Sequence, residues 1–376
     1  MIYLDSAATA KPSREALEVF AEINAKFWAN PDSMHDFGIK AEAILQHSRK
    51  NILESFNADG QYNLIFTSSA TESNNLIIKS AMNLRKTGKK HIVSSNIEHP
   101  SVREVLFFLQ KEGFDVEFLP VNENGTLCVK QVEQAVGNDT VLVSIMHVNN
   151  EIGSINDIFE MAKAVKKKNS AAIFHSDFSQ SVGKLPVDLK NSAIDFVSFS
   201  GHKIECIKGI AAVIFRKNVP ISPLLHGGEQ EFGFRASTPN PAAAAALAKS
   251  VKTAIKNQKK NYEKTKRLQN ILLENLLQIP EIQINSPKTN SPFIVNFSVT
   301  KQKPETILRA LSEKEIYIST VSACSAKKRG ESYVVKAATN DEKRAVSSLR
   351  VSLSSDLSEN DIPAFIKELK DILEKL

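Results

Sequence analysis

The stretch DFVSFSGHKIECIKGIAAVIF (residues 195–215) contains two apolar runs joined by a polar loop. Runs of β-branched and aromatic residues that end in polar turns are typical of strands, so we expect strands at 195–200 and 209–215. The loop between them carries His202 followed directly by Lys203. Because a lysine between buried strands is costly unless it is paired or solvated, it indicates a functional group at the end of a sheet.

Earlier in the chain, short apolar runs alternate with amphipathic, helix-like segments. The runs predicted to be strands are 63–68, 91–95, 115–120, 141–148 and 171–177. Alternation of strand and helix is the pattern of a largely parallel sheet with helices on both faces. The last strands follow one another more closely, which allows one of them to be antiparallel. The sequence therefore predicts an α/β fold with three layers and a mostly parallel sheet.

After 237–241 the sequence has a long helical pattern and then a shorter α+β region. The elements predicted there are strands at 293–299 and 349–354 and a final helix that starts near 358–361. A chain of 376 residues suits one large and one small domain. We expect a large domain at 15–255, and a smaller α+β C-terminal domain formed by 1–14 and 256–376.

The composition, with 42% hydrophobic and 24% charged residues, is that of an ordinary soluble protein. Lys and Arg number 48 against 42 Asp and Glu, and this excess of +6 is spread along the chain, which does not favour nucleic acid as a partner. Cys128, Cys206 and Cys324 are far apart and lack metal-ligand spacing. We therefore expect a cytoplasmic protein without a metal site and, since no apolar run approaches ~20 residues, without a membrane span.

Polar residues gather directly after several of the predicted strands. In open parallel sheets, ligands bind beyond the carboxyl ends of the strands, so these residues form the candidate site. One such cluster alone would mean little, but several at neighbouring strand ends indicate a common site. The clusters are 67–71, 98–99, 149–151, 177–180 and 200–203.

The chemistry of these clusters is specific when they are taken together. TSSATESNN (67–75) offers hydroxyl and backbone N–H groups that suit a phosphate, although alone it is more simply a helix N-cap with Glu72 in the first turn. Asp177 is either structural or the partner of a protonated ring nitrogen, and Lys203 is an amine that could form a Schiff base. A phosphate cradle, an acid for a pyridinium nitrogen and an imine-forming lysine describe a site for pyridoxal 5'-phosphate (PLP).

The chain resembles the cysteine desulfurases of the class-V aminotransferase superfamily, which are fold-type I PLP enzymes. HVNNEIG and SAC favour the desulfurase branch of that superfamily. The segments that carry the resemblance, all in the same order, are YLDSAAT, NPDSMHDFG, IFTSSATESNN, EHPSV, MHVNNEIG, HSDFSQSVGKLPVDL, SFSGHK, GGEQE, RASTPN, SAC and LRVSLS.

This resemblance implies an enzyme that converts L-cysteine to L-alanine and forms a homodimer with its site at the subunit interface. Sulfur would pass to an enzyme cysteine as a persulfide, and then to an acceptor protein such as an iron–sulfur scaffold or a tRNA-thiolation enzyme. The segment that holds Cys324 is long and polar, as in the long-loop desulfurases. The alternatives are a related selenocysteine or cysteine lyase, and a catalytically weak paralogue that acts as a binding partner in sulfur transfer.

The resemblance also implies a role for each residue of the cofactor site. Lys203 would bind PLP covalently and remove the substrate Cα proton, while His99 would stack on the ring and take part in proton transfer. Asp177 would pair with the pyridinium nitrogen and Gln180 with the ring hydroxyl. The phosphate would be held by Ala70, Thr71, Ser200, His202 and, from the other subunit, Thr238.

On the substrate side, Cys324 would be the nucleophile that takes the sulfur. Asn150 and Arg350 would hold the substrate carboxylate, Arg350 through a bidentate pair. These are the residues whose roles concern L-cysteine itself rather than the cofactor.

The chain departs from the family pattern at five loop positions. The residues found in place of the family's glycines are Ser69, Cys206, Glu229, Ser237 and Val321. A non-glycine residue held at positive φ costs on the order of 1 kcal/mol, so either these loops have shifted in a working enzyme or the chain is a drifted paralogue. Cys206 is interpreted as a small packing residue, with a second reactive thiol as the alternative.

Overall fold

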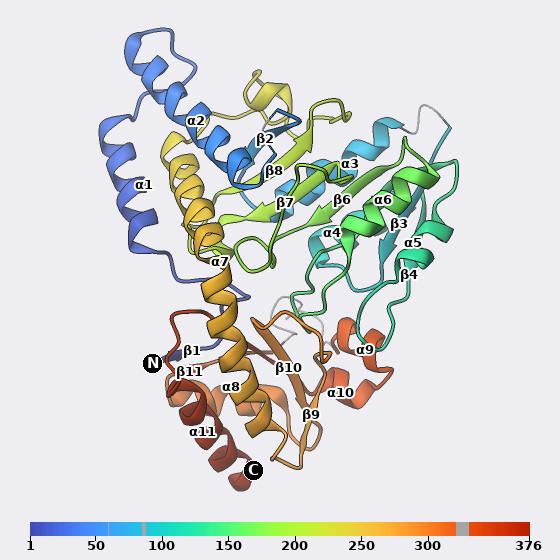
Figure 1. The fold of residues 1–376 in the computed structure, drawn as a ribbon, viewed down its shortest axis with the longest axis vertical. Coiled ribbons are helices and arrows are strands. Elements are labelled where there is room, and N and C mark those ends of the chain that lie inside the picture. The colour runs from blue at the N-terminus through green and yellow to red at the C-terminus, as the bar shows by residue number, and fades with distance from the viewer. Residues whose placement is uncertain (59, 85–87, 321–330) are drawn as a thin grey trace.

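The computed structural model describes residues 1–58, 60–84, 88–320 and 331–376. At its centre is a seven-stranded sheet with the strand order β2-β8-β7-β6-β5-β3-β4 (Figure 1). Its strands are β2 (Tyr62–Thr67), β3 (His91–Ser95), β4 (Asp115–Leu119), β5 (Thr140–Ser144), β6 (Ile173–Asp177), β7 (Phe196–Ser200) and β8 (Ala211–Arg216). All neighbours from β7 to β4 pair in parallel, whereas β8 is antiparallel to both β2 and β7. The predicted sheet, including its antiparallel strand, is confirmed.

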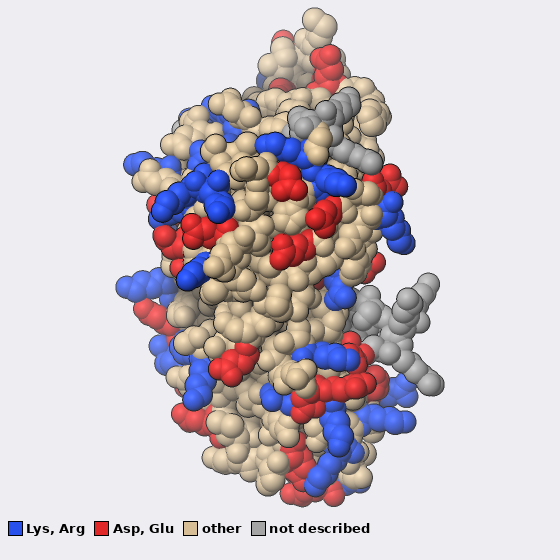
Figure 2. All heavy atoms as spheres, turned by 90° about the vertical axis from the view of Figure 1, so that its right-hand side faces the viewer, with Lys and Arg blue, Asp and Glu red and all other residues tan. Residues whose placement is uncertain are grey.

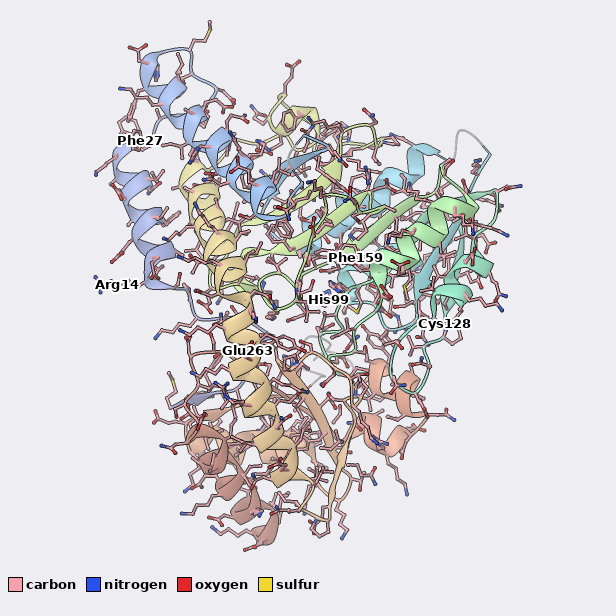
Figure 3. The ribbon with its side chains drawn as sticks, in the orientation of Figure 1. Arg14, Phe27, His99, Cys128, Phe159 and Glu263 are labelled. Atoms are coloured by element: carbon pink, nitrogen blue, oxygen red, sulfur yellow. The ribbon has the colours of Figure 1, made fainter. Side chains whose placement is uncertain are left out.

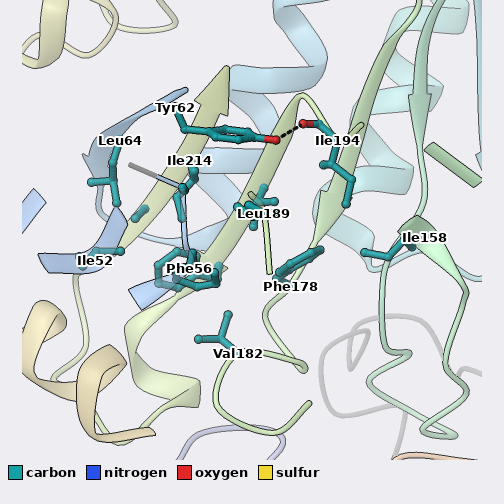
Figure 4. Packing of buried hydrophobic residues seen from close by; sticks show 14 of the residues in the cluster. Ile52, Phe56, Tyr62, Leu64, Ile158, Phe178, Val182, Leu189, Ile194 and Ile214 are labelled. Carbon is teal, nitrogen blue, oxygen red and sulfur yellow. Dashed lines mark hydrogen bonds between the residues drawn. The ribbon is translucent and has the colours of Figure 1, made fainter. Parts of the chain in front are cut away.

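Helices cover both faces of this sheet because alternate strand residues point to opposite sides. In β2, Leu64 and Phe66 belong to one hydrophobic cluster and Ile65 to another. The first cluster also contains Phe56 (Figure 4), and the second contains Leu106. The helices of this part are α1 (Arg14–Lys26), α2 (Asp36–Ser55), α3 (Ala70–Leu84), α4 (Pro100–Lys111), α5 (Val129–Ala135) and α6 (Ile158–Lys168). The three predicted layers are therefore present.

Helix α7 (Pro241–Leu276) connects the central sheet to a second sheet (Figure 1). Asn240 directly precedes this helix and caps it, because its side chain accepts from the backbone N–H of Ala243. Its alanine-rich first part packs against α1 and α2. Its later residues Leu268 and Leu272 belong to a separate hydrophobic core that also contains Phe297.

The second sheet is antiparallel, with the strand order β12-β13-β10-β9. Its strands are β9 (Ile282–Ile284), β10 (Ile294–Val299), β12 (Ser319–Thr320) and β13 (Ser348–Ser352). A small parallel pair lies beside it, β1 (Ile2–Tyr3) with β11 (Ile316–Tyr317). The remaining helices are α8 (Pro304–Glu313), α9 (Tyr333–Thr339), α10 (Glu342–Val346), α11 (Asp361–Lys375) and the short η2 (Gly201–Lys203) and η3 (Glu231–Gly233). The strands and final helix expected in the α+β region correspond to β10, β13 and α11.

The division into domains at 15–255, and at 1–14 with 256–376, stays a prediction. It is supported by the separate core beneath the second sheet, because that core includes Leu4 from the N-terminal segment. On the face seen in Figure 2, Lys and Arg are interspersed with Asp and Glu. Among the helices of the described ranges, none combines the length and apolarity needed to cross a bilayer.

Candidate active site

A cavity of about 770 Å³ lies beyond the carboxyl ends of β6 and β7, and Arg350 from β13 also lines it. Figure 3 shows His99 between the two sheets, at the level of this cavity. The predicted strand-end clusters therefore meet in one place. The predicted site residues that line the cavity are Ala70, Thr71, His99, Asn150, Asp177, Gln180, Ser200, His202, Lys203 and Arg350.

Two predicted site residues are not brought into this group. Cys324 lies outside the described residues. Thr238 is exposed and does not line the cavity of its own chain. Its expected role concerns the site of a second subunit, and that role stays a prediction.

Lys203 ends the short helix η2 directly after β7. Its Nζ donates to the backbone carbonyls of Ala7 at 2.5 Å and Ala8 at 2.6 Å. Gly201 permits this loop to pack closely, because a Cβ there would lie 3.0 Å from the carbonyl oxygen of Ile210. The amine is thus held between the end of the sheet and the N-terminal segment.

Gln180 is fixed from two sides. Its Nε2 donates to the carbonyl of Ala7 at 2.9 Å, and its Oε1 accepts from Lys184 Nζ at 2.8 Å. Lys184 is buried, and burial, followed by the charges of Lys203 and Arg350, lowers the pKa of its amine to about 7. Sequence reasoning missed Lys184, because a lysine within a polar segment is usually a surface residue.

Asp177 and His99 present an acceptor and a neutral ring to the cavity. Asp177 ends β6 and accepts from the backbone N–H of Ser179 at 2.8 Å and from Asn74 Nδ2 at 2.9 Å. His99 is the N-cap of α4, and its Nδ1 accepts from the backbone N–H of Ser101 at 3.1 Å. Burial lowers the pKa of His99 below its usual 6.5, which keeps the imidazole neutral at neutral pH.

Arg350 forms the cationic part of the opposite wall. Its Nη2 donates to the Asp5 carboxylate at 2.8 Å, and its Nη1 donates to the backbone carbonyl of Asn150 at 3.0 Å. Its Nε is buried and has no hydrogen-bond partner among the described residues. Sequence reasoning missed Asp5, although it lies in the YLDSAAT segment that carried part of the resemblance.

Two buried carboxyl groups lie on or beside this wall. Burial raises the pKa of Glu98 to about 8 and that of Glu151 to about 7. Glu98 accepts from Ser95 Oγ at 2.5 Å, and Glu151 accepts from Ser332 Oγ at 2.5 Å. Both residues belong to the predicted polar clusters, but nothing in the sequence predicted the raised pKa of their carboxyl groups.

The comparisons with known proteins identify the family. A family model described as aminotransferase class-V matches residues 2–365. The chain belongs to the class-V aminotransferase family. A cysteine desulfurase IscS from Dictyoglomus turgidum is 35% identical over 377 residues, which cover all of this chain and 95% of that one. The resemblance predicted from the sequence is confirmed.

Solved structures of the same family agree. A NifS-like protein superimposes with a TM-score of 0.93 at 31% identity, and the match covers 100% of both chains. A structure described as SspA in complex with cysteine superimposes with a TM-score of 0.82 at 30% identity, over 94% of this chain and 99% of that one. The predicted fold class, that of the fold-type I PLP transferases, is confirmed.

PLP is the cofactor of this class-V aminotransferase, and the residues that line the cavity fit it. The start of α3, with Ala70 and Thr71, offers N–H and hydroxyl donors for a phosphate, close in the fold to Ser200 and His202. Asp177 offers an acceptor for a ring N–H group. The buried Ser179 Oγ, also on the cavity wall, has no partner among the described residues and is a further polar group that a ligand could satisfy.

Most of the described positions that lack the family's glycines do not have left-handed backbone. Ser69, Cys206 and Glu229 have φ values outside the positive range, and Ser237 has φ 158°, at the edge of the extended region. Val321 lies outside the described residues. Three of the four described positions therefore avoid left-handed backbone, which fits loops that have shifted, while positive φ occurs nearby at Glu231 (φ 50°) and Phe232 (φ 60°).

Cys206 is fully buried and belongs to the hydrophobic cluster that fills one face of the central sheet. Burial raises the pKa of its thiol to about 11, so the thiolate is scarce at neutral pH. Left-handed backbone occurs instead at the preceding residue, Glu205, with φ 60°. These observations favour the packing interpretation of Cys206 over that of a second reactive thiol.

Proposed function

We propose that this chain is a PLP-dependent cysteine desulfurase, which removes sulfur from L-cysteine and leaves L-alanine. The observation that carries the proposal is the convergence of Lys203, Asp177 and His99 on one cavity wall in a chain of this family. The names of the relatives support the same activity, and the cysteine bound in the SspA structure supports L-cysteine as the substrate.

Bound PLP would supply an electron sink that makes the substrate Cα proton acidic. Lys203 would hold the cofactor through Nζ and, once free, take the Cα proton. Asp177 would accept a hydrogen bond from the ring N–H group, and Gln180 would donate to the ring hydroxyl. The groups that would hold the phosphate are Ala70 through its backbone, Thr71, Ser200, His202 and, from a second subunit, Thr238.

The opposite wall would receive the substrate. Arg350, together with Asn150, would bind the carboxylate of L-cysteine, and the buried Nε of Arg350 is a donor still available for it. Cys324 would attack the substrate sulfur as a thiolate, so that the Cβ–S bond breaks and the sulfur remains on Cys324 as a persulfide. Neutral His99 would move protons in this step through a ring nitrogen.

We further propose a homodimer in the cytoplasm that passes its sulfur to an acceptor protein, either an iron–sulfur scaffold or a thiolation enzyme. Thr238 supports the dimer, because it is exposed in its own chain while its segment RASTPN belongs to the shared family pattern.

The test is alanine formation from L-cysteine, with added PLP and a thiol reductant, by the wild type and Cys324→Ala side by side. We expect alanine from the wild type alone. Alanine from both proteins would contradict the role of Cys324 and favour a lyase. Alanine from neither, in protein that retains bound cofactor, would favour the catalytically weak paralogue.

A further inference from the structure

We propose that Asn74 is a positioning residue that fixes the Asp177 carboxylate beneath the expected cofactor ring. The proposal rests on the proposed function for its catalytic meaning. Asn74 lies on α3 and is fully buried. Its Nδ2 donates to Asp177 Oδ2 at 2.9 Å and to Ser101 Oγ at 2.8 Å. One amide group therefore reaches both residues that face the cofactor ring, Asp177 directly and His99 through Ser101.

The orientation of the Asn74 amide follows from its neighbours. An ionised Asp177 can only accept, so the NH₂ group of Asn74 must face it and Oδ1 must face Ser198. Ser198 Oγ then donates to Asn74 Oδ1 at 2.5 Å and accepts from His175 Nε2 at 3.1 Å. His175 Nδ1 in turn accepts from Ser144 Oγ at 2.9 Å. Every donor in this series of hydrogen bonds, from Asn74 to Ser144, has an acceptor.

The hydrogen bonds of this series require His175 to be neutral, and its burial favours that state. His175 is fully buried, and burial lowers the pKa of its imidazole to about 4. A neutral imidazole has one N–H and one acceptor nitrogen, which match Ser198 and Ser144 respectively. The network beneath Asp177 is therefore uncharged, and it leaves the carboxylate as the acceptor for a ring N–H group.

The second branch from Asn74 reaches His99 through Ser101. Ser101 Oγ accepts from Asn74, so its own hydrogen is free to point at His99 Nδ1, 2.8 Å away. The same Nδ1 also accepts from the backbone N–H of Ser101. With donors directed at Nδ1, the neutral ring carries its proton on Nε2. His99 is thereby presented to the cavity as an Nε2–H imidazole.

The decisive experiment compares Asn74→Leu and Asn74→Asp with Asn75→Leu. Asn75 is the next residue on α3, and its side chain donates to the carbonyl of Thr71 in its own helix, which makes it a matched control. The readouts are the ¹⁵N chemical shifts of His99 in the apoprotein, which report its tautomer, and the affinity for PLP. Thermal unfolding checks that each variant is folded.

In the wild type and Asn75→Leu we expect His99 as the Nε2–H tautomer. In both Asn74 variants we expect PLP affinity lower by about ten- to a hundredfold, the effect of losing a hydrogen bond to a charged group. The His99 tautomer should stay unchanged, because the backbone N–H of Ser101 still donates to Nδ1. In Asn74→Asp, two carboxyl groups would face each other, so one of them must take up a proton. If the Asn74 variants do not fold, Ser198→Ala removes the hydroxyl that donates to Asn74 Oδ1 and orients its amide, and we expect lower PLP affinity there as well.

Unchanged PLP affinity in the folded Asn74 variants would overturn the proposal. So would unchanged PLP affinity in Ser198→Ala. Because neither readout needs turnover of L-cysteine, this failure is distinguishable from failure of the proposed desulfurase activity.

Discussion

The two walls of the cavity are built differently. The wall beneath the expected cofactor consists of residues at or near the ends of regular elements, held by an uncharged hydrogen-bond network around Asn74. The opposite wall joins segments far apart in the chain, and its main contact is the ion pair between Asp5 and Arg350. The fold alone therefore positions the side chains of the first wall. The second wall depends on the ion pair between Asp5 and Arg350, whose contacts would change when a substrate carboxylate binds.

The largest effect is expected from Lys203→Ala, which removes the amine that would hold the cofactor. We expect alanine formation to fall by at least about 10²- to 10⁴-fold, because the positioned base is lost. The cofactor should then bind only noncovalently, which absorption spectroscopy will detect. Lys217→Ala, at an exposed lysine just after β8, is the control. Turnover that stays within a few-fold of wild type would rule out Lys203 as the base.

Arg350→Lys tests whether the second wall affects binding of the substrate but not of the cofactor. Loss of the bidentate guanidinium should raise the KM for L-cysteine by about ten- to a hundredfold, because lysine cannot form the paired contacts. PLP affinity should remain unchanged, in contrast to the Asn74 variants. Steady-state kinetics and cofactor titration measure the two effects separately, with Arg309→Lys on the exposed face of α8 as the control. A weakened PLP affinity with a normal KM would reverse the assignment of the walls.

Lys184→Met tests whether the pKa of the buried Lys184 amine, which donates to Gln180, is lowered. The readout is the pH dependence of the free energy of unfolding. The native state releases the Lys184 proton near pH 7, whereas the unfolded chain holds it up to its ordinary 10.5, so unfolding takes up a proton between these values. The free energy of unfolding of the wild type should therefore rise with pH in this window, by at most ~1.4 kcal/mol per pH unit from this group. Below about pH 7 both states hold the proton, and the contribution has no slope.

Denaturant unfolding at several pH values between neutral and alkaline measures this contribution. The Lys184→Met variant should lack the rise, and Lys217→Met should keep it. Equal slopes in the wild type and Lys184→Met would show that Lys184 stays protonated in the native protein.

The smallest effect is expected from Cys206→Ala, which changes neither wall. It should cost about 1 kcal/mol of stability, the usual size for a small change in the core, and leave alanine formation unchanged. Thiol labelling of the folded protein should spare Cys206, because it is fully buried. A variant as inactive as Cys324→Ala would revive the second-thiol interpretation.

The sequence predicted the first wall better than the second. Asp177 and Lys203 could be recognised because each follows an apolar strand, and strand ends of a parallel sheet converge. Asn74 was hidden within a segment interpreted as a phosphate cradle, since no local pattern shows which side of a helix will meet β6. Asp5 could not be paired with Arg350 because their contact spans 345 residues of sequence.

The loops were predicted least well. The replaced glycines allowed either strain or a shifted loop at Cys206, and in the structure the positive φ lies one residue earlier, at Glu205. Such a shift depends on the packing of the whole loop against its neighbours and leaves no trace in the local sequence.

The most direct test of the account is mass spectrometry of the peptide that contains Cys324, after incubation of the PLP-loaded protein with L-cysteine and without reductant. The account predicts one added sulfur atom on Cys324 and an equivalent of L-alanine. An unmodified Cys324 together with alanine and released elemental sulfur, or with no alanine at all, would contradict it.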